Sequence, residues 1–444
     1  MNVVVAKEKA AFSNGQYVAL AFPLIIAGIT TPLIGAVDTA VVGRLPDPSS
    51  IGGVAIGAVI FNTMYWLLGF LRVSTSGFTA QAQGSDKGYE TILTLLRPMI
   101  IAIIFGLLFI IFQKPILHIS LNVIGGSEAV SSFASTYFSI RIWGAPFILM
   151  SYVFIGWLIG MGKVRLALAT QLVMNMMNIA LSIIFVLVLG LGVAGVAYAT
   201  LISEISAVLF GGFIIARHNK IGFSNVDRRM MLDPEPLMKM IKVNRDLFLR
   251  TVCLLIMTGI FTSKGAGMGE VTLAANAILL QIHYIMAYLI GGFANASSIL
   301  TGRSIGGKDP FLFRRAVNLS AVWGGGTAVI LAALILLFGD SVVELFTSID
   351  TVRALAIENL IWMVIFPFVG FWGLQLEGIF SGATDAKSIR NSIFVALLVF
   401  LFAIWLFVPM YENQGIWLAF VVFSLGRSIF LARYLPQLQR LHFS

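Results

Sequence analysis

Long apolar runs fill most of this chain, and short polar or glycine- and proline-rich breaks separate them. Each run is at least as long as the roughly 20 residues that a helix needs to cross a bilayer. The pattern therefore predicts twelve transmembrane helices, at residues 17–43, 50–83, 91–113, 131–160, 166–190, 193–216, 240–262, 271–305, 315–338, 355–382, 388–410 and 414–434.

The longest polar break divides the twelve runs six and six. It runs from Arg217 to Pro236, RHNKIGFSNVDRRMMLDPEP, and its charges and prolines are typical of a connector in water. We expect an all-α polytopic membrane protein with an N-terminal six-helix lobe at 1–216, a cytoplasmic connector at 217–239 and a C-terminal six-helix lobe at 240–444.

The two halves resemble each other at an offset near 222 residues. LLGFLRVSTSGFTAQAQG (67–84) aligns with LIGGFANASSILTGRSIG (289–306), and GWLIG (156–160) aligns with GIFSG (378–382). Likewise GVAYA (195–199) aligns with GIWLA (415–419). Because each half holds six helices, both repeats enter the membrane in the same direction. Parallel repeats of this kind are typical of transporters with two pseudo-symmetric lobes.

Composition excludes a soluble protein. The chain is 59% hydrophobic and 11% charged, with a mean hydropathy of +0.95, whereas soluble domains carry about 25% charged residues. The net charge of +9 would suggest a nucleic-acid partner in a soluble chain, but here the basic residues bear first on topology. We therefore expect a lipid bilayer and no nucleic acid as partner.

The basic residues are distributed unevenly between the two sides of the predicted membrane. With both ends in the cytoplasm, 21 of the 29 Lys and Arg fall on that side, and four fall on the other, namely Arg44, Lys114, Lys264 and Arg353. This asymmetry follows the positive-inside rule. It predicts a multi-pass protein of the inner (plasma) membrane with both termini cytoplasmic.

The first apolar run carries a carboxylate and two prolines, Asp38, Pro23 and Pro32. An ionised Asp inside a membrane costs roughly 2.5 to 3.5 kcal/mol on insertion scales, and an interior proline kinks a helix. A titratable group on a bendable helix suits a proton-driven machine. The alternative is a signal anchor in which Asp38 lies at the water interface.

A few other polar residues lie well inside the apolar runs. Asn175, Asn178 and Ser182 share one face of a helix, since they are three and four residues apart, and Thr200 and Glu204 share another. We expect these faces to converge on Asp38. For Asn175 and Thr200, simple hydrogen bonding between helices is an equal alternative.

For the two other acids inside the apolar runs, Glu204 and Glu377, the alternative to a role in transport is a structural ion pair. Glu204 is expected to pair with an intramembrane arginine, Arg72 or Arg141, and Glu377 in the second half with Arg250. Glu377 is also the second-lobe candidate for a coupling site.

Two further segments, KPILHISLNV (114–123) and GDSVVELFTSI (339–349), occupy matching places in the two halves. Both predict short amphipathic helices at the membrane surface.

The chain resembles the multidrug and toxic compound extrusion (MATE) family, and within it the DinF branch. The resemblance rests on DTAVVG at the end of helix one, GFLRVSTSGFTAQAQG in helix two, NRDLFLRT opening helix seven, and LAANAILLQ with GRSIGGKD around helix eight. It implies a V-shaped bundle of two six-helix lobes that exports organic cations in exchange for protons or sodium ions.

The resemblance also implies roles for single residues. Asp38 resembles the helix-one carboxylate of proton coupling, and Pro23 the proline at which helix one bends. The implied cavity residues are Asn178, Thr200 and Tyr137, although Tyr137 has interfacial anchoring as its alternative. This chain departs from the branch at Ser182, where members can carry an Asp, so Asp38 is expected to act alone or with Glu204.

From these observations we expect a secondary active transporter, not an enzyme, that exports cationic or lipophilic drugs by antiport with protons. The alternatives are a sodium-coupled antiporter and a flippase for a lipid-linked precursor. An intramembrane enzyme is disfavoured because no Asp-rich or His-Glu metal motif is present. The single Cys253 and four scattered histidines offer no metal site, so we expect no metal and no cofactor, and a chain that acts as a monomer.

Overall fold

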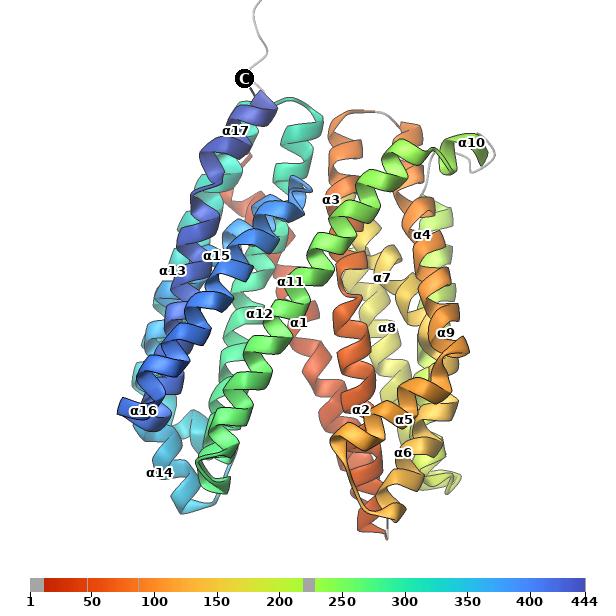
Figure 1. The fold of residues 1–444 in the computed structure, drawn as a ribbon. Coiled ribbons are helices and arrows are strands. Elements are labelled where there is room, and N and C mark those ends of the chain that lie inside the picture. The colour runs from red at the N-terminus through yellow and green to blue at the C-terminus, as the bar shows by residue number, and fades with distance from the viewer. Residues whose placement is uncertain (1–11, 46, 87, 219–227, 444) are drawn as a thin grey trace, which may run out of the picture. The chain divides into compact units, whose positions relative to one another are not determined.

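The computed structural model describes residues 12–45, 47–86, 88–218 and 228–443, without the side chains of residues 31–36, 39, 218 and 228. Within these ranges every regular element is helical. The elements are α1 (Asn14–Val42), α2 (Pro48–Leu67), α3 (Phe70–Gly84), α4 (Gly88–Ile111), α5 (Gln113–Ile124), α6 (Glu128–Arg141), η1 (Ile142–Gly144), α7 (Ala145–Gly160), α8 (Val164–Ile183), η2 (Ile184–Val188), α9 (Gly192–His218), α10 (Arg228–Met231), α11 (Pro234–Ala266), α12 (Glu270–Gly306), α13 (Pro310–Glu344), α14 (Asp350–Glu358), α15 (Ile361–Gly382), α16 (Ala386–Ala432) and α17 (Leu435–Phe443) (Figure 1).

These helices account for all twelve predicted spans. Ten helical stretches in the described ranges are long and apolar enough to cross a membrane. The 29-residue α1 adds another. The 47-residue α16 holds two spans, because its backbone leaves the helical region at Glu412, where φ is +47°. The loop predicted between residues 410 and 414 is this break.

The chain divides into two compact units. The N-terminal unit comprises Ile26–Val252, and the C-terminal unit comprises Cys253–Ser444 together with the chain up to Ile25. The division therefore passes through α1 and through α11, inside two helices. The lobe boundaries at 216 and 240 were drawn from the longest polar break and stay a prediction. Residues 219–227 of the predicted connector lie outside the described residues.

Equivalent glycine contacts between helices occur inside each of the two units. In the N-terminal unit, a Cβ added to Gly156 of α7 would meet the backbone of Arg72 in α3, and one added to Gly160 would meet Ser76. In the C-terminal unit, the glycines aligned with these, Gly378 and Gly382 of α15, abut the backbones of Ala294 and Ser298 in α12. Both contacts of the N-terminal unit thus recur in the C-terminal unit at an offset of 222 residues. The repeat found in the sequence is thus a repeat of helix packing.

One of the two predicted surface helices forms and the other does not. The segment at 114–123 lies in α5, none of whose residues is buried. The segment at 339–349 was predicted wrongly as a separate helix, because α13 continues without a break to Glu344. Gly339 lies inside α13, and its missing side chain leaves room for Leu360 to pack against this helix.

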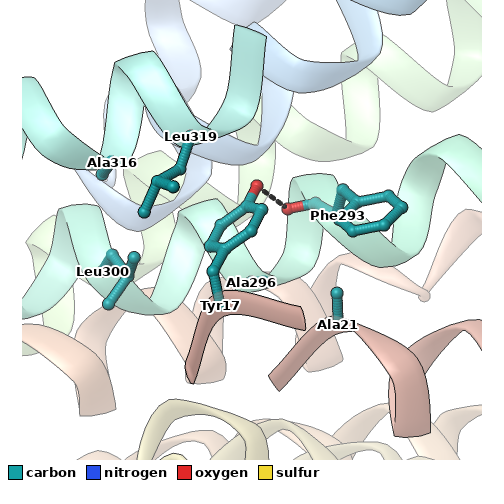
Figure 2. Packing of buried hydrophobic residues seen from close by; sticks show 7 residues of the cluster. All are labelled: Tyr17, Ala21, Phe293, Ala296, Leu300, Ala316 and Leu319. Carbon is teal, nitrogen blue, oxygen red and sulfur yellow. Dashed lines mark hydrogen bonds between the residues drawn. The ribbon is translucent and has the colours of Figure 1, made fainter. Parts of the chain in front are cut away.

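The first turns of α1 are packed into the C-terminal unit. Tyr17 is fully buried, and its hydroxyl donates to the backbone oxygen of Phe293 at 2.9 Å and lies 2.7 Å from Ser297 Oγ (Figure 2). Ala21 packs in the same cluster, which α12 and α13 complete with Phe293, Ala296, Leu300, Ala316 and Leu319. The beginning of the chain is therefore a structural part of the unit formed by its end.

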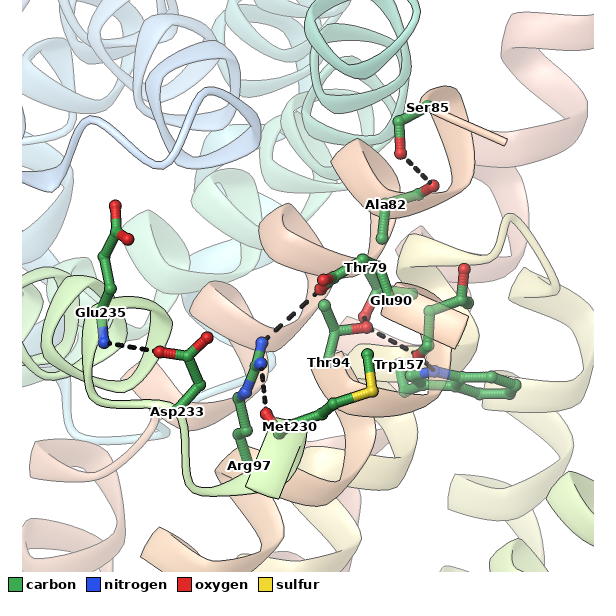
Figure 3. Close-up of polar contacts among 11 residues, drawn as sticks. Thr79, Ala82, Ser85, Glu90, Thr94, Arg97, Trp157, Met230, Asp233 and Glu235 are labelled. Carbon is green, nitrogen blue, oxygen red and sulfur yellow. Dashed lines mark hydrogen bonds and ion pairs between the residues drawn. The ribbon is translucent and has the colours of Figure 1, made fainter. Parts of the chain in front are cut away.

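A buried arginine fastens the short helix α10 to the N-terminal unit. The Arg97 guanidinium on α4 donates to the backbone oxygen of Met230 at 2.7 Å and lies 3.6 Å from Glu90 (Figure 3). Close by, Trp157 Nε1 donates to the backbone oxygen of Thr91 at 2.8 Å. The described end of the polar segment before α11 is thus attached to α4 rather than loose.

Candidate functional site

The Asp38 carboxylate lies near the C-terminal end of α1 in the N-terminal unit. Ser182 Oγ donates a hydrogen bond to Asp38 Oδ1 over 3.1 Å. Ser182 itself is fully buried near the end of α8, just before the π-helical turn η2. Such turns are rare and are often found at functional sites. Position 182, at which the resemblance implied that an acid can stand, therefore holds a hydroxyl that donates to Asp38.

One turn earlier on α8, Asn178 reaches the neighbouring helix α9. Its side-chain amide Nδ2 donates to Thr200 Oγ1 over 3.0 Å, and Thr200 donates in turn to the backbone oxygen of Val196. Ser182 and Asn178 are four residues apart on one helix face, as are Thr200 and Glu204 on the facing helix. The hydrogen bond at Asp38 and the ion pair at Glu204 therefore lie about one helical turn on either side of the Asn178–Thr200 hydrogen bond.

Glu204 pairs with Arg141, one of the two arginines that the sequence offered. Arg141 Nη2 lies 3.7 Å from Glu204 Oε1, and the two side chains are 13% and 3% exposed. Arg141 Nη1 also donates to the Tyr137 hydroxyl over 2.8 Å. The expected pairing with an intramembrane arginine is therefore confirmed.

These contacts join side chains of α1, α8, α9 and α6 in three neighbouring groups, which together we call the polar chain. The groups are Asp38 with Ser182, Asn178 with Thr200, and Glu204 with Arg141 and Tyr137. Of the polar faces expected to converge on Asp38, that of α8 reaches it through Ser182, and the convergence of the others stays a prediction. Their roles in transport stay a prediction.

Several buried polar atoms of this region make no hydrogen bond within the described residues. They are Asn178 Oδ1, Glu204 Oε2, Arg141 Nε and both amide atoms of Asn175, which lies one turn from Asn178. A buried polar group without a partner costs about 1 to 3 kcal/mol. Such atoms are rare in native proteins unless water or a ligand satisfies them. The region around the polar chain is therefore equipped to bind a polar or charged guest.

Sequence reasoning named Tyr137 but missed Phe61 and Tyr65, the two other aromatic side chains around Arg141. Its guanidinium carbon lies 4.6 Å from the ring centroid of Phe61, 5.9 Å from that of Tyr65 and 5.6 Å from that of Tyr137. Phe61 and Tyr65 come from α2, which contributes no acid to the site. The spacing in the sequence could have indicated these rings. Phe61 and Tyr65 are four residues apart and so share one helix face, and Tyr137 and Arg141 do the same.

Two other candidates lie in the C-terminal unit. Pro23 lies within α1, which continues as a helix through it, two residues before the boundary between the units. Glu377 accepts a hydrogen bond from Arg427 over 2.7 Å. The expected partner Arg250 belongs to the other unit, so that pairing stays a prediction. Among the described residues no group of three His, Cys, Asp or Glu is arranged to hold a metal ion.

Comparison with known proteins identifies relatives over almost the whole chain. The family model described as MatE matches residues 23–184 and again 247–406, one match in each half. The chain is 36% identical over 413 residues to the DNA damage-inducible protein F of Escherichia coli (strain K12), covering 93% of this chain and 90% of the relative. It is 23% identical over 398 residues to a probable multidrug resistance protein NorM of Photorhabdus laumondii, covering 86% and 85% of the two chains.

The fold has a solved counterpart. A structure described as "Crystal structure of MATE in the bent conformation" matches with a TM-score of 0.87 and 21% identity, covering 97% of both chains. The all-helical fold of twelve transmembrane helices in two six-helix lobes, predicted from the sequence, is confirmed by this likeness.

Proposed function

The chain belongs to the MatE family, whose members are transporters and not enzymes, and we propose that it exports organic cations and hydrophobic drugs in exchange for protons, with Asp38 as the coupling carboxylate. The observation that carries this proposal is the polar chain of the N-terminal unit. It begins at Asp38, on the helix that the two units share, and continues through buried side chains of three further helices.

Of the two acids of the polar chain, Asp38 and Glu204, the surroundings favour Asp38 as the one that binds a proton and a cationic drug in turn. Glu204 already has a guanidinium counter-charge in Arg141, whereas the described partner of Asp38 is the uncharged hydroxyl of Ser182. A carboxylate in surroundings of low dielectric constant gains from taking up either a proton or a cation. A proton and a cationic drug therefore compete for Asp38.

Competition of this kind is sufficient for antiport. A proton that enters from outside neutralises Asp38 and releases the drug there, and loss of the proton to the cytoplasm restores the attraction for the next drug molecule. The two states must differ in conformation as well as in affinity. We assign that change to a bend of α1 at Pro23, since an interior proline weakens a helix and a solved relative is described as bent.

We further propose that the protein lies in the plasma membrane with both termini cytoplasmic, because 21 of its 29 basic residues then face the cytoplasm. The inward proton gradient of a living cell would drive export, because antiport moves the drug against the direction of proton flow.

The test is transport of a fluorescent cation by purified protein in liposomes, energised first by a pH gradient and then by a sodium gradient. We expect transport driven by the pH gradient, and we expect Asp38→Asn to abolish it while the protein stays folded. The matched control is Asp340→Asn, the same change at an exposed position near the end of α13, which should transport normally.

Two outcomes would overturn the proposal. Transport driven by sodium alone would move the coupling to another set of oxygen ligands. Unchanged pH-driven transport by Asp38→Asn would remove Asp38 from the mechanism. Absence of dye transport with both gradients would favour the flippase alternative, which a lipid-scrambling assay on the same liposomes can detect.

A further inference from the structure

Arg141 occupies a built site rather than a chance position. Its guanidinium is stacked among three aromatic rings from two helices, α2 and α6, and the Tyr137 hydroxyl accepts one of its hydrogen bonds. Rings at these distances attract a cation through their negative faces. The guanidinium is therefore held in one place, close to Glu204.

The backbone also makes room for Glu204. A Cβ on Gly144, in the η1 turn that follows Arg141, would overlap Glu204 Oε2. The same oxygen makes no hydrogen bond within the described residues. The contact that remains, between Glu204 and Arg141, joins opposite charges at 3.7 Å, which is longer than a charge-assisted hydrogen bond of about 2.7 to 2.9 Å.

Stability alone is a poor explanation for such a pair. Taking two charges out of water costs several kcal/mol each, and a pair that is not tightly hydrogen-bonded recovers little of that cost. Apolar side chains of similar size would pack there at least as well. The charge of Arg141 therefore matters through what it cancels, the negative charge of Glu204.

The charges of the site can be counted. The helices that build it are α1, α2, α6, α8 and α9, and their described parts hold six charged residues. Three of these belong to the polar chain, namely Asp38, Arg141 and Glu204. The other charged residues of these helices stand in a first or last turn, and they are Glu128, Arg165 and Arg217. With both acids ionised, the site therefore carries a net charge of −1.

We propose that Arg141, by cancelling the charge of Glu204, sets the charge preference of the substrate site, making it a site for singly charged organic cations. Arg141 cancels one of the two carboxylates, so a monocation neutralises the site and a dication leaves an uncompensated positive charge. In surroundings of low dielectric constant such an excess charge is expensive. This inference rests on the proposed function only in placing the substrate beside Asp38.

The test uses two dyes that share one ring system and differ in charge, ethidium with one positive charge and propidium with two. Their binding to the purified full-length protein is measured by equilibrium dialysis at fixed pH and ionic strength. The parent protein should prefer ethidium. Arg141→Met raises the negative charge of the site by one, and should shift the ratio of the two affinities toward propidium by about tenfold. Glu204→Gln should weaken ethidium binding by a similar factor.

The double variant Arg141→Met with Glu204→Gln separates charge from structure. It removes both members of the pair and restores a net charge of −1, so its affinity ratio should return to that of the parent. Removing both charges also avoids leaving one buried ion alone, which makes this variant the one most certain to fold. Arg72→Met removes the same charge from α3, outside the polar chain, and should leave the ratio unchanged.

The proposal is overturned if Arg141→Met and Arg72→Met give the same affinity ratio, if the double variant keeps the shift toward propidium, or if neither dye binds the parent protein. These results are independent of the coupling ion, because no gradient is applied. A shifted affinity ratio in Arg141→Met together with transport driven only by sodium would sustain this inference and overturn the proposed function. An unchanged ratio together with proton-driven transport that depends on Asp38 would overturn this inference and sustain the proposed function.

Discussion

At the scale of single residues, spacing along a helix predicted more than residue type did. Asn178 and Ser182 were expected on one face because they are four residues apart, and each makes a contact from that face. The sequence left two arginines as partners for Glu204, since nothing in a chain reveals which helices become neighbours. The packing of the helices in the structure identifies Arg141 as the partner and places the Phe61 and Tyr65 rings beside it.

Gly57 provides a test of those rings. A Cβ at this position on α2 would overlap the ring of Tyr137, so Gly57→Ala should displace Tyr137 and the hydrogen bond that it accepts from Arg141. Overpacking of this kind typically costs about 1 to 3 kcal/mol. We expect a lowered melting temperature together with weaker cation binding. The control Gly212→Ala on α9, where a Cβ meets only the Phe154 ring at 3.8 Å or more, should leave both measurements unchanged.

At the scale of helices, apolar run length was sufficient to find every span, because crossing a bilayer imposes a minimum length. Helix ends were less predictable. The span predicted to end at residue 338 continues to Glu344 in α13, whereas Glu412, an ordinary helix former, stands at the break in α16. The residue after that break, Asn413, exchanges two hydrogen bonds with Asn276 of α12. Such long-range contacts are not visible in local sequence.

The repeated glycine contacts should behave alike in the two units. Gly160→Ala would drive a Cβ into the backbone of Ser76, and Gly382→Ala would do the same at Ser298. Backbone atoms cannot move aside as side-chain ends can, so each change should lower the melting temperature by a similar amount. Gly326→Ala on α13, where nothing lies within 4 Å of the added atom, should be neutral or slightly stabilising. Thermal unfolding of the three variants in one detergent measures the difference, and unequal losses at the two aligned positions would show that the repeats no longer pack equivalently.

At the scale of the whole molecule, charge distribution predicts orientation where the fold alone does not. The chain has one cysteine, Cys253, which is buried, so Cys253→Ala provides a background for labelling. In right-side-out vesicles, a membrane-impermeant maleimide should label Asn122→Cys on the exposed surface of α5. Gln437→Cys, exposed on α17, should react only after the vesicles are opened. The reverse labelling would invert the proposed topology.

The sharing of α1 between the units has a consequence for biosynthesis. Tyr17 takes its place against Phe293, 276 residues later in the chain. At synthesis rates of roughly 5 to 20 residues per second, the ribosome needs about 14 to 55 s to cover that distance. Throughout this interval the start of the first helix is already made, but the residues of α12 and α13 against which Tyr17 and Ala21 pack are not. The C-terminal unit therefore cannot mature during translation from its own segments alone, and it is completed only when the newest helices capture the oldest one.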